Sequence, residues 1–426
     1  MAQKATSKGS LLFIFITVLI DIMGIAIIIP VFPDLIEALT GQQTSEASLD
    51  GGLLIASFAI MQFLFSPLLG ELSDRFGRRP VLFIALAGLG VDYLFQAFAP
   101  TLALLFVGRM LAGVCGASHT VAAAYIADVS TPQNKAKNFG LLGAAFGLGF
   151  FLGPMIGGVC AQWGYQVPFI AAAIMTFLNL IFGLIVLPES LKPENRRPIN
   201  WRNVIPGVSL KHLSKYKSLG LLILAFILVQ LSGRVMESIW TFFTKTAFEW
   251  SPAAIGVSLG VVGLLVGIVQ AVVVGKVVKR FGKKKAILAG FVLSTVGLFG
   301  ISVAFSETIL YIALIPYILG GIAGPTMQGL MSNSVKENEQ GNLQGALTSM
   351  ISLTAVLGPL IYTTLFFTFS ADDAPVKFYG APYVASAVIM ILASVIVYIA
   401  LKRLPDDGED EDSSDSTEVE MAVTTD

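Results

Sequence analysis

The sequence predicts an all-α integral membrane protein, and three observations support that fold class. First, 55% of the 426 residues are hydrophobic and only 13% are charged, whereas an ordinary soluble domain has about 25% charged residues. Second, twelve apolar stretches have the length, about 18 to 25 residues, that crosses a bilayer as a helix. Third, the second half of the chain repeats features of the first. We therefore expect twelve transmembrane helices in two six-helix bundles.

The predicted spans follow one another along the chain with mostly short polar connections. Those of the first half cover residues 11–31, 51–69, 81–99, 102–126, 139–160 and 168–187. Those of the second half cover residues 219–243, 252–274, 286–304, 309–331, 345–369 and 380–401. A short positive stretch precedes the first span, but no small-residue cleavage pattern follows it. That span is therefore predicted to be a retained helix and not a signal peptide.

The internal repeat is clearest in a charged turn between two apolar stretches. Residues 70–79, GELSDRFGRR, return as residues 275–284, GKVVKRFGKK, at an offset of 275 − 70 = 205 positions. The same offset joins Gly140 to Gly345, and a fixed offset indicates an internal duplication. It predicts a first bundle at 1–187, a cytoplasmic linker at 188–217, a second bundle at 218–403 and a disordered acidic cytoplasmic tail at 404–426.

The distribution of basic residues predicts the orientation in the membrane. If the N-terminus is cytoplasmic, 23 of the 27 Lys and Arg residues fall in inner segments, at the chain ends or in the linker. Basic residues are enriched in cytoplasmic loops of membrane proteins. Both termini are therefore expected in the cytoplasm, with the protein multi-pass in the cell inner membrane.

Five charged residues fall inside predicted spans: Asp21, Asp92, Arg109, Arg234 and Glu237. Each costs about 2.5 to 3.5 kcal/mol at a helix centre, so they must face a cavity or one another. Asp21 lies about 15 Å into the first span, at 1.5 Å per residue. A buried carboxylate near an arginine can load and release a proton, which favours proton coupling for Asp21 with Arg109 and makes Asp92 a further candidate. The alternative is a static ion pair that only fixes packing.

Polar residues in the second half are candidates for a substrate-binding wall. Arg234 and Glu237 are three residues apart and share a helix face, which Gln230 extends. The alternative is a self-neutralised pair near the outer end of the span. Gln270 and Gln328 are further substrate-binding candidates in spans 8 and 10.

The charged turn resembles the signature loop of the major facilitator superfamily, written G-x-L-x-D-R-x-G-R-R/K. The resemblance implies that Asp74, Arg78 and Asp128 form a charge relay that holds the outward-open state closed on its inner side. The repeat has Lys279, Lys283 and Asn333 at these places, so we expect an asymmetric gate. The gating residues assigned to the first copy are Gly70, Asp74, Arg75, Gly77, Arg78, Arg79 and Asp128.

The fifth span carries a second motif, GFFLGPMIGG at 149–158. It resembles the G-x-x-x-G-P-x-x-G-G antiporter signature of drug exporters in that superfamily. Small residues let helices pack closely, and a proline bends a helix that must rock. The alternative is ordinary glycine-mediated packing. The gating residues assigned here are Gly149, Gly153, Pro154, Gly157 and Gly158.

Nearly the whole chain is similar to the tetracycline-resistance-type drug/proton antiporters. The likeness includes LIDIMGI around Asp21, VDYL around Asp92 and GRMLAGVCG around Arg109. It implies a proton-coupled exporter of small, partly apolar drug-like or metabolite compounds that works by alternating access as a monomer. The chain lacks that family's carboxylate in span 9 and histidine in span 8, while span 7 gains Arg234 and Glu237. The antiport mechanism is therefore carried over, and tetracycline as the substrate is not.

Two other classes of function remain open from the sequence. The same scaffold could import or facilitate a small polar or charged solute, or it could serve as a membrane sensor without transport. The sequence has no metal-ligand cluster, nucleotide-binding loop or catalytic triad. We therefore expect no enzyme activity, no cofactor and no nucleic-acid partner. The expected partners are a small-molecule substrate, protons and the lipid bilayer, with the proton gradient as the energy source.

Overall fold

The computed structural model describes residues 8–116, 118–131, 134–199, 201–204, 219–335 and 340–403. Every regular element within these residues is a helix. The predicted tail at 404–426 and most of the predicted linker beyond residue 204 lie outside the described residues.

Among the described residues, twelve helical segments are long and apolar enough to cross a membrane, as the sequence predicts. The first half contains α1 (Lys8–Ile27), η1 (Ile29–Val31), α2 (Phe32–Thr40), α3 (Thr44–Phe76), α4 (Arg78–Phe98), α5 (Leu102–Cys115), α6 (Ser118–Val129), α7 (Lys135–Cys160), η2 (Ala161–Trp163) and α8 (Val167–Val186). Two short helices follow, η3 (Pro193–Asn195) and α9 (Trp201–Val204). The second half contains α10 (Gly220–Phe248), α11 (Pro252–Ile268), the π-helical segment η6 (Val269–Val273), α12 (Val274–Phe281), α13 (Lys283–Ser302), α14 (Glu307–Gly320), α15 (Ala323–Asn333), α16 (Gln340–Ser370) and α17 (Ala381–Leu401).

Several spans are longer or more divided than the apolar stretches predict. The first span continues through Pro30 and Pro33 as η1 and α2, so the helical segment reaches Thr40. Prolines lack a backbone donor and interrupt an α-helix, although they are tolerated in the first turn of the next one. α3 begins at Thr44, seven residues before the predicted start at 51. The predicted spans contain only apolar stretches, so polar residues that extend a helix at its ends were not included in them.

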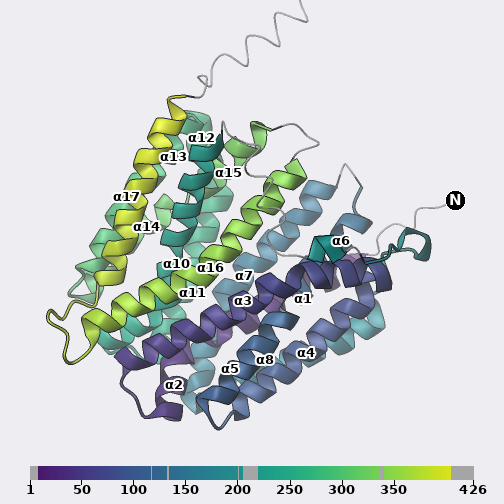
Figure 1. Cartoon of the computed structure of the whole chain (residues 1–426), viewed down its shortest axis with the longest axis horizontal. Coiled ribbons are helices and arrows are strands. Elements are labelled where there is room, and N and C mark those ends of the chain that lie inside the picture. Colours follow the sequence, from purple (N-terminus) through teal and green to yellow (C-terminus); the bar gives the residue numbers. More distant parts are fainter. Residues whose placement is uncertain are drawn as a thin grey trace, which may run out of the picture.

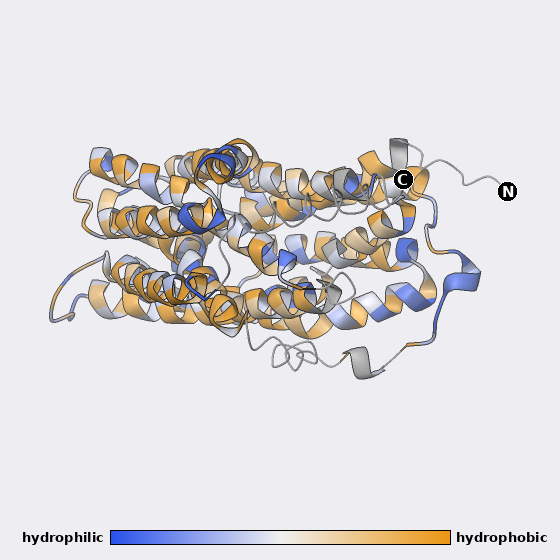
Figure 2. Cartoon of the chain, turned by 90° about the horizontal axis from the view of Figure 1, so that it is seen from above, coloured by the Kyte–Doolittle hydropathy of each residue, from blue (hydrophilic) through white to orange (hydrophobic). Residues whose placement is uncertain are grey.

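The helices form two groups that follow the two halves of the sequence. In Figure 1 the purple and blue helices α1 to α8 gather at the lower right, and the teal, green and yellow helices α10 to α17 at the upper left. Figure 2 shows that the helices are mostly hydrophobic along their lengths, while hydrophilic residues are concentrated at helix ends and in connections. This pattern fits helices whose apolar surfaces face lipid and one another.

The two groups meet mainly where α3 packs against α16 and α7 packs against α11. The α7 and α11 contact runs from Gly158 beside Ala253 to Gly263 beside Phe150. Beyond Phe150, a Cβ placed on Gly147 or Gly143 would have no atom within 4 Å other than those of its own helix and chain neighbours. α7 and α11 therefore touch near the C-terminal end of α7 and separate toward its N-terminal end.

A second set of contacts joins the halves at the same end. Lys245 of α10 forms ion pairs with Asp34 and Glu37 of α2, the latter with Nζ–Oε2 at 2.7 Å. Close by, the ring of Phe242 occupies the space that a side chain on Gly51 would need. The closed end of the molecule is thus held by apolar packing together with a small charged cluster.

Candidate functional site

Three charged side chains from separate helices are buried in the first half. Asp21 of α1 is 5% exposed, Asp92 of α4 is 2% exposed and Arg109 of α5 is 5% exposed. Charged groups are almost never buried to this degree unless they are paired or have a functional role. The structure thus places all three predicted proton-coupling residues in the interior.

Each of the two carboxylates has one hydrogen-bond donor and one free oxygen. Asp21 Oδ2 accepts a hydrogen bond from Ser118 Oγ at 2.5 Å, and Asp92 Oδ2 accepts one from Gln96 Nε2 at 2.5 Å. The Oδ1 atoms of both residues are buried and have no hydrogen-bond partner. A buried carboxylate oxygen without a donor is costly when charged, so each group is well suited to bind a proton.

Arg109 holds its positive charge against two aromatic rings. Its guanidinium carbon lies 4.7 Å from the ring centre of Phe58 and 5.6 Å from that of Phe32, and its Nε has no hydrogen-bond partner. The carboxylate that acts electrostatically on Arg109 is that of Asp92. The sequence analysis assigned Asp21 and Arg109 together to proton coupling. In the structure the hydrogen-bond donor to Asp21 is the hydroxyl of Ser118, and the carboxylate that acts on Arg109 is that of Asp92.

Tyr93 connects these groups and was not predicted from the sequence. Its ring fills the space that a side chain on Gly24 would need, one helical turn after Asp21. Tyr93 is 3% exposed and lies within electrostatic range of Asp21, Asp92 and Arg109. Its position next to Asp92 in the chain is the one sequence signal that could have identified it.

At the far end of the first half, the predicted relay residues lie together. Arg78 forms an ion pair with Asp74, and its Nε lies 3.1 Å from Asp128 Oδ2. Between α3 and α4, Gly77 has φ of +106°, a conformation that disfavours residues with a Cβ. This backbone turn brings Arg78 back over Asp74.

The first residues after α8 bind directly to this relay, which the sequence did not predict. Glu189 accepts hydrogen bonds from the backbone N–H groups of Arg78 at 2.9 Å and Arg79 at 3.2 Å, and so caps α4. Ser190 Oγ donates to Asp128 Oδ2 at 3.0 Å. An acidic side chain at a helix N-terminus is favoured by the helix dipole and by the free N–H groups.

Arg197 adds a further contact between the linker and the relay. It forms an ion pair with Asp74 and one with Glu71, the latter with Nη2–Oε1 at 3.4 Å. Hydrogen bonding to Asp74 raises the pKa of the Arg197 guanidinium above its ordinary value. We call residues 188–199 the linker strap, because this segment is fastened to the relay at Glu189, Ser190 and Arg197.

The other residues assigned to this loop have different surroundings. Arg79 Nη2 donates to the carbonyl oxygen of Leu184 at 2.9 Å. Arg75 is exposed and lies over the ring of Phe76 at 5.3 Å. A Cβ on Gly70 would meet no atom within 4 Å outside its own helix and chain neighbours. Neither Arg75 nor Gly70 is part of the relay itself.

The repeated turn in the second half has the same backbone break but no relay. Gly282 separates α12 from α13 with φ of +78°. Within the described part of the chain, no ion pair or hydrogen bond joins Lys279, Lys283 and Asn333. The contacts of the two loops therefore differ, while an asymmetric gate stays a prediction.

The glycine motif of α7 packs two of its faces closely. On one face, a Cβ on Gly149 would lie 2.7 Å from Ile22 Cβ, and one on Gly153 would lie 2.7 Å from Ala26 Cβ. Gly157 continues this face against the backbone of Ile27. On the other, Gly158 lies against the backbone of α11, while the carbonyl group of Pro154 occupies the place of a side chain on Gly256.

The polar residues of α10 form a short chain toward α16. Arg234 Nη1 lies 2.6 Å from Glu237 Oε2, and Arg234 Nη2 donates to the carbonyl oxygen of Ile351 at 3.3 Å. The Arg234 side chain is 18% exposed and that of Glu237 is 49% exposed. Gly358 leaves room for the Arg234 stem. Gln230, one helical turn before Arg234, is half-buried.

The two remaining substrate candidates do not join this group. Gln270 is exposed within the π-helical segment η6. Gln328 of α15 donates to Gln344 Oε1 at 2.9 Å. Among the described residues, no hydrogen bond connects either glutamine to Arg234 or Glu237.

The family model described as Major Facilitator Superfamily matches residues 14–269 and 222–423, which together cover most of the chain. The chain belongs to the Major Facilitator Superfamily. It is a multi-pass inner-membrane transporter, in keeping with the long apolar helices of the described residues.

Curated relatives place this superfamily member among proteins named for drug resistance. It is 39% identical over 360 residues to the tetracycline resistance protein, class C, of Escherichia coli, covering 84% of this chain and 90% of that relative. It is 37% identical over 352 residues to the class B protein of Escherichia coli, covering 82% and 86%. Multidrug resistance protein 2 of Bacillus subtilis (strain 168) is 26% identical over 372 residues, covering 85% and 91%.

Solved structures of superfamily members share the fold. A bacterial homologue of the human lysosomal transporter Spinster, in an inward-facing and unoccupied conformation, matches with a TM-score of 0.78 and 14% identity over 96% of this chain and all of that chain (100%). The human organic anion transporter MFSD10 (TETRAN) matches with a TM-score of 0.70 and 22% identity over 92% and 99%. At these identities the likeness concerns the fold alone.

Proposed function

We propose that this transporter exports small, partly apolar drug-like or metabolite compounds in exchange for protons by alternating access. The observation that carries the proposal is the buried cluster of Asp21, Asp92 and Arg109, in which each carboxylate keeps one free oxygen. A structural ion pair would satisfy its oxygens, because an unpartnered charge in the interior is destabilising. Free oxygens fit a site that must bind and release protons.

In this proposal the two six-helix bundles are the products of the internal duplication, and both termini face the cytoplasm. The N-terminal end of α7 then points to the cytoplasm, where α7 and α11 separate, and the Lys245 cluster closes the opposite side. The molecule is in this view open to the inside. Proton release from Asp21 toward the cytoplasm would accompany substrate loading.

In this proposal the relay at Arg78 and the closely packed glycines of α7 (Gly149, Gly153, Gly157 and Gly158, with Pro154), here called the glycine seam, serve as the gate. The relay lies on the inner side, where Arg78 is paired with Asp74 and Asp128 although this side is open here, so the relay ion pairs alone do not keep it closed. The seam allows α7 to lie close to both α1 and α11 and to change its angle without breaking side-chain contacts.

Arg234 and Glu237, with Gln230, supply the polar wall of the substrate cavity, and Gln270 and Gln328 contact the substrate at other points of its path. The half-exposed Glu237 carboxylate can accept a hydrogen bond from a substrate while Arg234 neutralises it. Tetracycline belongs in the test set because of the names of the relatives. The absence of a charge in residues 286–304 argues for a broader set of compounds.

The experiment is substrate-induced proton release from everted inner-membrane vesicles that contain the transporter and are energised with lactate. A panel of tetracycline, other amphipathic drugs and small metabolites is added to acidified vesicles, and the interior pH is followed with a fluorescent dye. We expect at least one compound to cause proton efflux. Vesicles with the Asp21→Asn variant serve as the matched control and should give no response.

The proposal of antiport is contradicted if compounds accumulate in the vesicles without any proton movement. That result would fit a facilitator on the same scaffold. Equal proton efflux from wild-type and Asp21→Asn vesicles would contradict the assignment of Asp21.

A further inference from the structure

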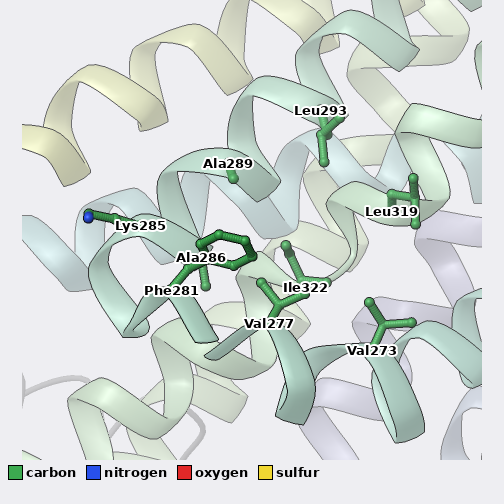
Figure 3. Close-up of a pocket in the computed structure, with 9 residues that line it drawn as sticks. All are labelled: Val273, Val277, Phe281, Lys285, Ala286, Ala289, Leu293, Leu319 and Ile322. Atoms are coloured by element: carbon green, nitrogen blue, oxygen red, sulfur yellow. The ribbon is translucent and has the colours of Figure 1, made fainter. Parts of the chain in front are cut away.

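An apolar groove lies in the second half, away from the buried charges of the first. It has a volume of about 380 Å³ and is bounded by the end of η6, α12, α13, the end of α14 and Ile322. Figure 3 shows Val273, Val277 and Phe281 along one side and Leu293 and Leu319 at one end. Phe281 is 53% exposed and Leu319 is 37% exposed, so the groove is open to the surroundings of the protein and is not an enclosed cavity.

The groove has one polar lining residue, Lys285, at the end opposite Leu293. In Figure 3 the amine of Lys285 points away from the apolar side chains. Lys285 and Leu293 are eight positions apart on α13, which corresponds to about 12 Å along the helix. The groove is therefore hydrophobic along its length and has a positive charge at one end, which we call its mouth.

Five further basic residues lie on the same two helices. Lys276, Lys279 and Arg280 lie on α12, and Lys283 and Lys284 lie beside Lys285 at the start of α13. Neither helix contains an acidic residue. A ligand that fits has an apolar chain for the groove and a negative group for the lysine.

We propose that this groove binds one acyl chain of an anionic phospholipid, with the lipid phosphate on Lys285. α12 and α13 are parts of helical segments long and apolar enough to cross a membrane, where lipid chains are available to an open apolar groove. Basic residues at the ends of membrane helices attract anionic head groups. The proposal does not depend on the direction of transport or on the substrate.

The test is native mass spectrometry of the purified full-length protein after exchange into an equal mixture of phosphatidylglycerol and phosphatidylcholine. We expect each wild-type protein to retain one more molecule of phosphatidylglycerol than of phosphatidylcholine. Lys285→Gln removes the charge at the mouth, and Ala289→Leu fills the groove from an exposed position on α13. Each of these two variants should lose the additional phosphatidylglycerol molecule.

Two substitutions on the same helices provide matched controls. Lys276→Gln removes a basic residue that does not line the groove, and Val292→Leu enlarges a side chain that is 58% exposed on α13 outside it. Both should keep the lipid. Equal retention of the two phospholipids by the wild type, retention of phosphatidylglycerol by either groove variant, or a free fatty acid in place of the phospholipid would overturn the proposal.

Discussion

At the residue scale, the buried charges of the first half are held by few and weak partners. Asp21 depends on one hydroxyl, Asp92 on one amide, and Arg109 on two aromatic faces. Because the cation–π contacts leave the Arg109 charge only partly compensated, the charge of Asp92 is its main electrostatic support.

This arrangement predicts coupled stabilities for Arg109 and Asp92. Arg109→Gln should destabilise the protein by about 1–3 kcal/mol, because it leaves the buried Asp92 carboxylate without the positive charge that acts on it. Adding Asp92→Asn should restore part of that loss. The measurement is thermal unfolding of the purified variants in one detergent, with the exposed Arg75→Gln as a control that changes little. Losses that simply add in the double variant would contradict an electrostatic coupling of the two residues.

The sequence could identify the charges of this site but only part of their surroundings. A charge in an apolar helix stands out by its cost, so Asp21, Asp92 and Arg109 were predictable. Ser118 lies 97 positions from Asp21. A serine within an apolar stretch does not by itself indicate that it donates a hydrogen bond to a distant carboxylate. The contact depends on how α1 and α6 pack, which one sequence does not specify.

At the element scale, α7 is the helix that joins the two halves. It packs extensively on both α1 and α11, and glycines at both contacts keep the backbones close. Its motif was predicted as a packing and gating element. The close approaches at Gly153 and Gly158 agree with the packing part, while the gating part stays a prediction.

Enlarging the α7 and α11 contact should open the end of the molecule that is closed here. Gly158→Leu places a side chain against the backbone of Pro252 and Ala253, so the closed contact can form only if a helix shifts. Spin labels on the exposed positions Gln166 and Asp373 should report longer distances by double electron–electron resonance. Gly147→Leu, at an open position of the same helix, should leave the distances unchanged. No shift in the Gly158→Leu variant would argue against a role of the seam in closure.

The linker strap should be loosened by removing one side chain. Arg197→Gln breaks its ion pairs with Asp74 and Glu71 while the cap formed by Glu189 remains. We expect faster hydrogen exchange in peptides that cover residues 188–199, measured by mass spectrometry at low salt, and a smaller difference at high salt because exposed pairs are screened. Lys192→Gln, a substitution at an exposed residue on the same segment, is the control. Equal exchange in the two variants would contradict the strap.

The strap also marks the limit of sequence reasoning about elements. Its prolines and basic residues predict a linker that begins at residue 188, and α8 ends at Val186. The fastening to the relay was missed because Glu189 is an ordinary acidic residue in a loop. Its partners, the backbone N–H groups of Arg78 and Arg79, are 111 and 110 positions away.

At the scale of the whole molecule, the two halves meet at one end and separate at the other along α7 and α11. The cluster of Lys245, Asp34 and Glu37 at the closed end is partly exposed, and such pairs contribute about 0–1 kcal/mol each. Helix packing, and not these ion pairs, therefore stabilises the closed end. When this end opens, packing contacts at the other end can replace those that are lost. The sequence predicted two halves but not which end is closed, because alternating conformations of one chain differ by only a few kcal/mol.

The central claim is that Asp21 couples proton movement to this exchange of conformations. The most direct measurement compares two kinds of transport by Asp21→Asn in proteoliposomes, with tetracycline or another compound from the panel that the wild type transports. We predict loss of uphill transport driven by a pH gradient and retention of exchange between equal pools on both sides. Asp372→Asn, which alters an exposed loop carboxylate, should retain both activities. Full uphill transport by Asp21→Asn would contradict the account.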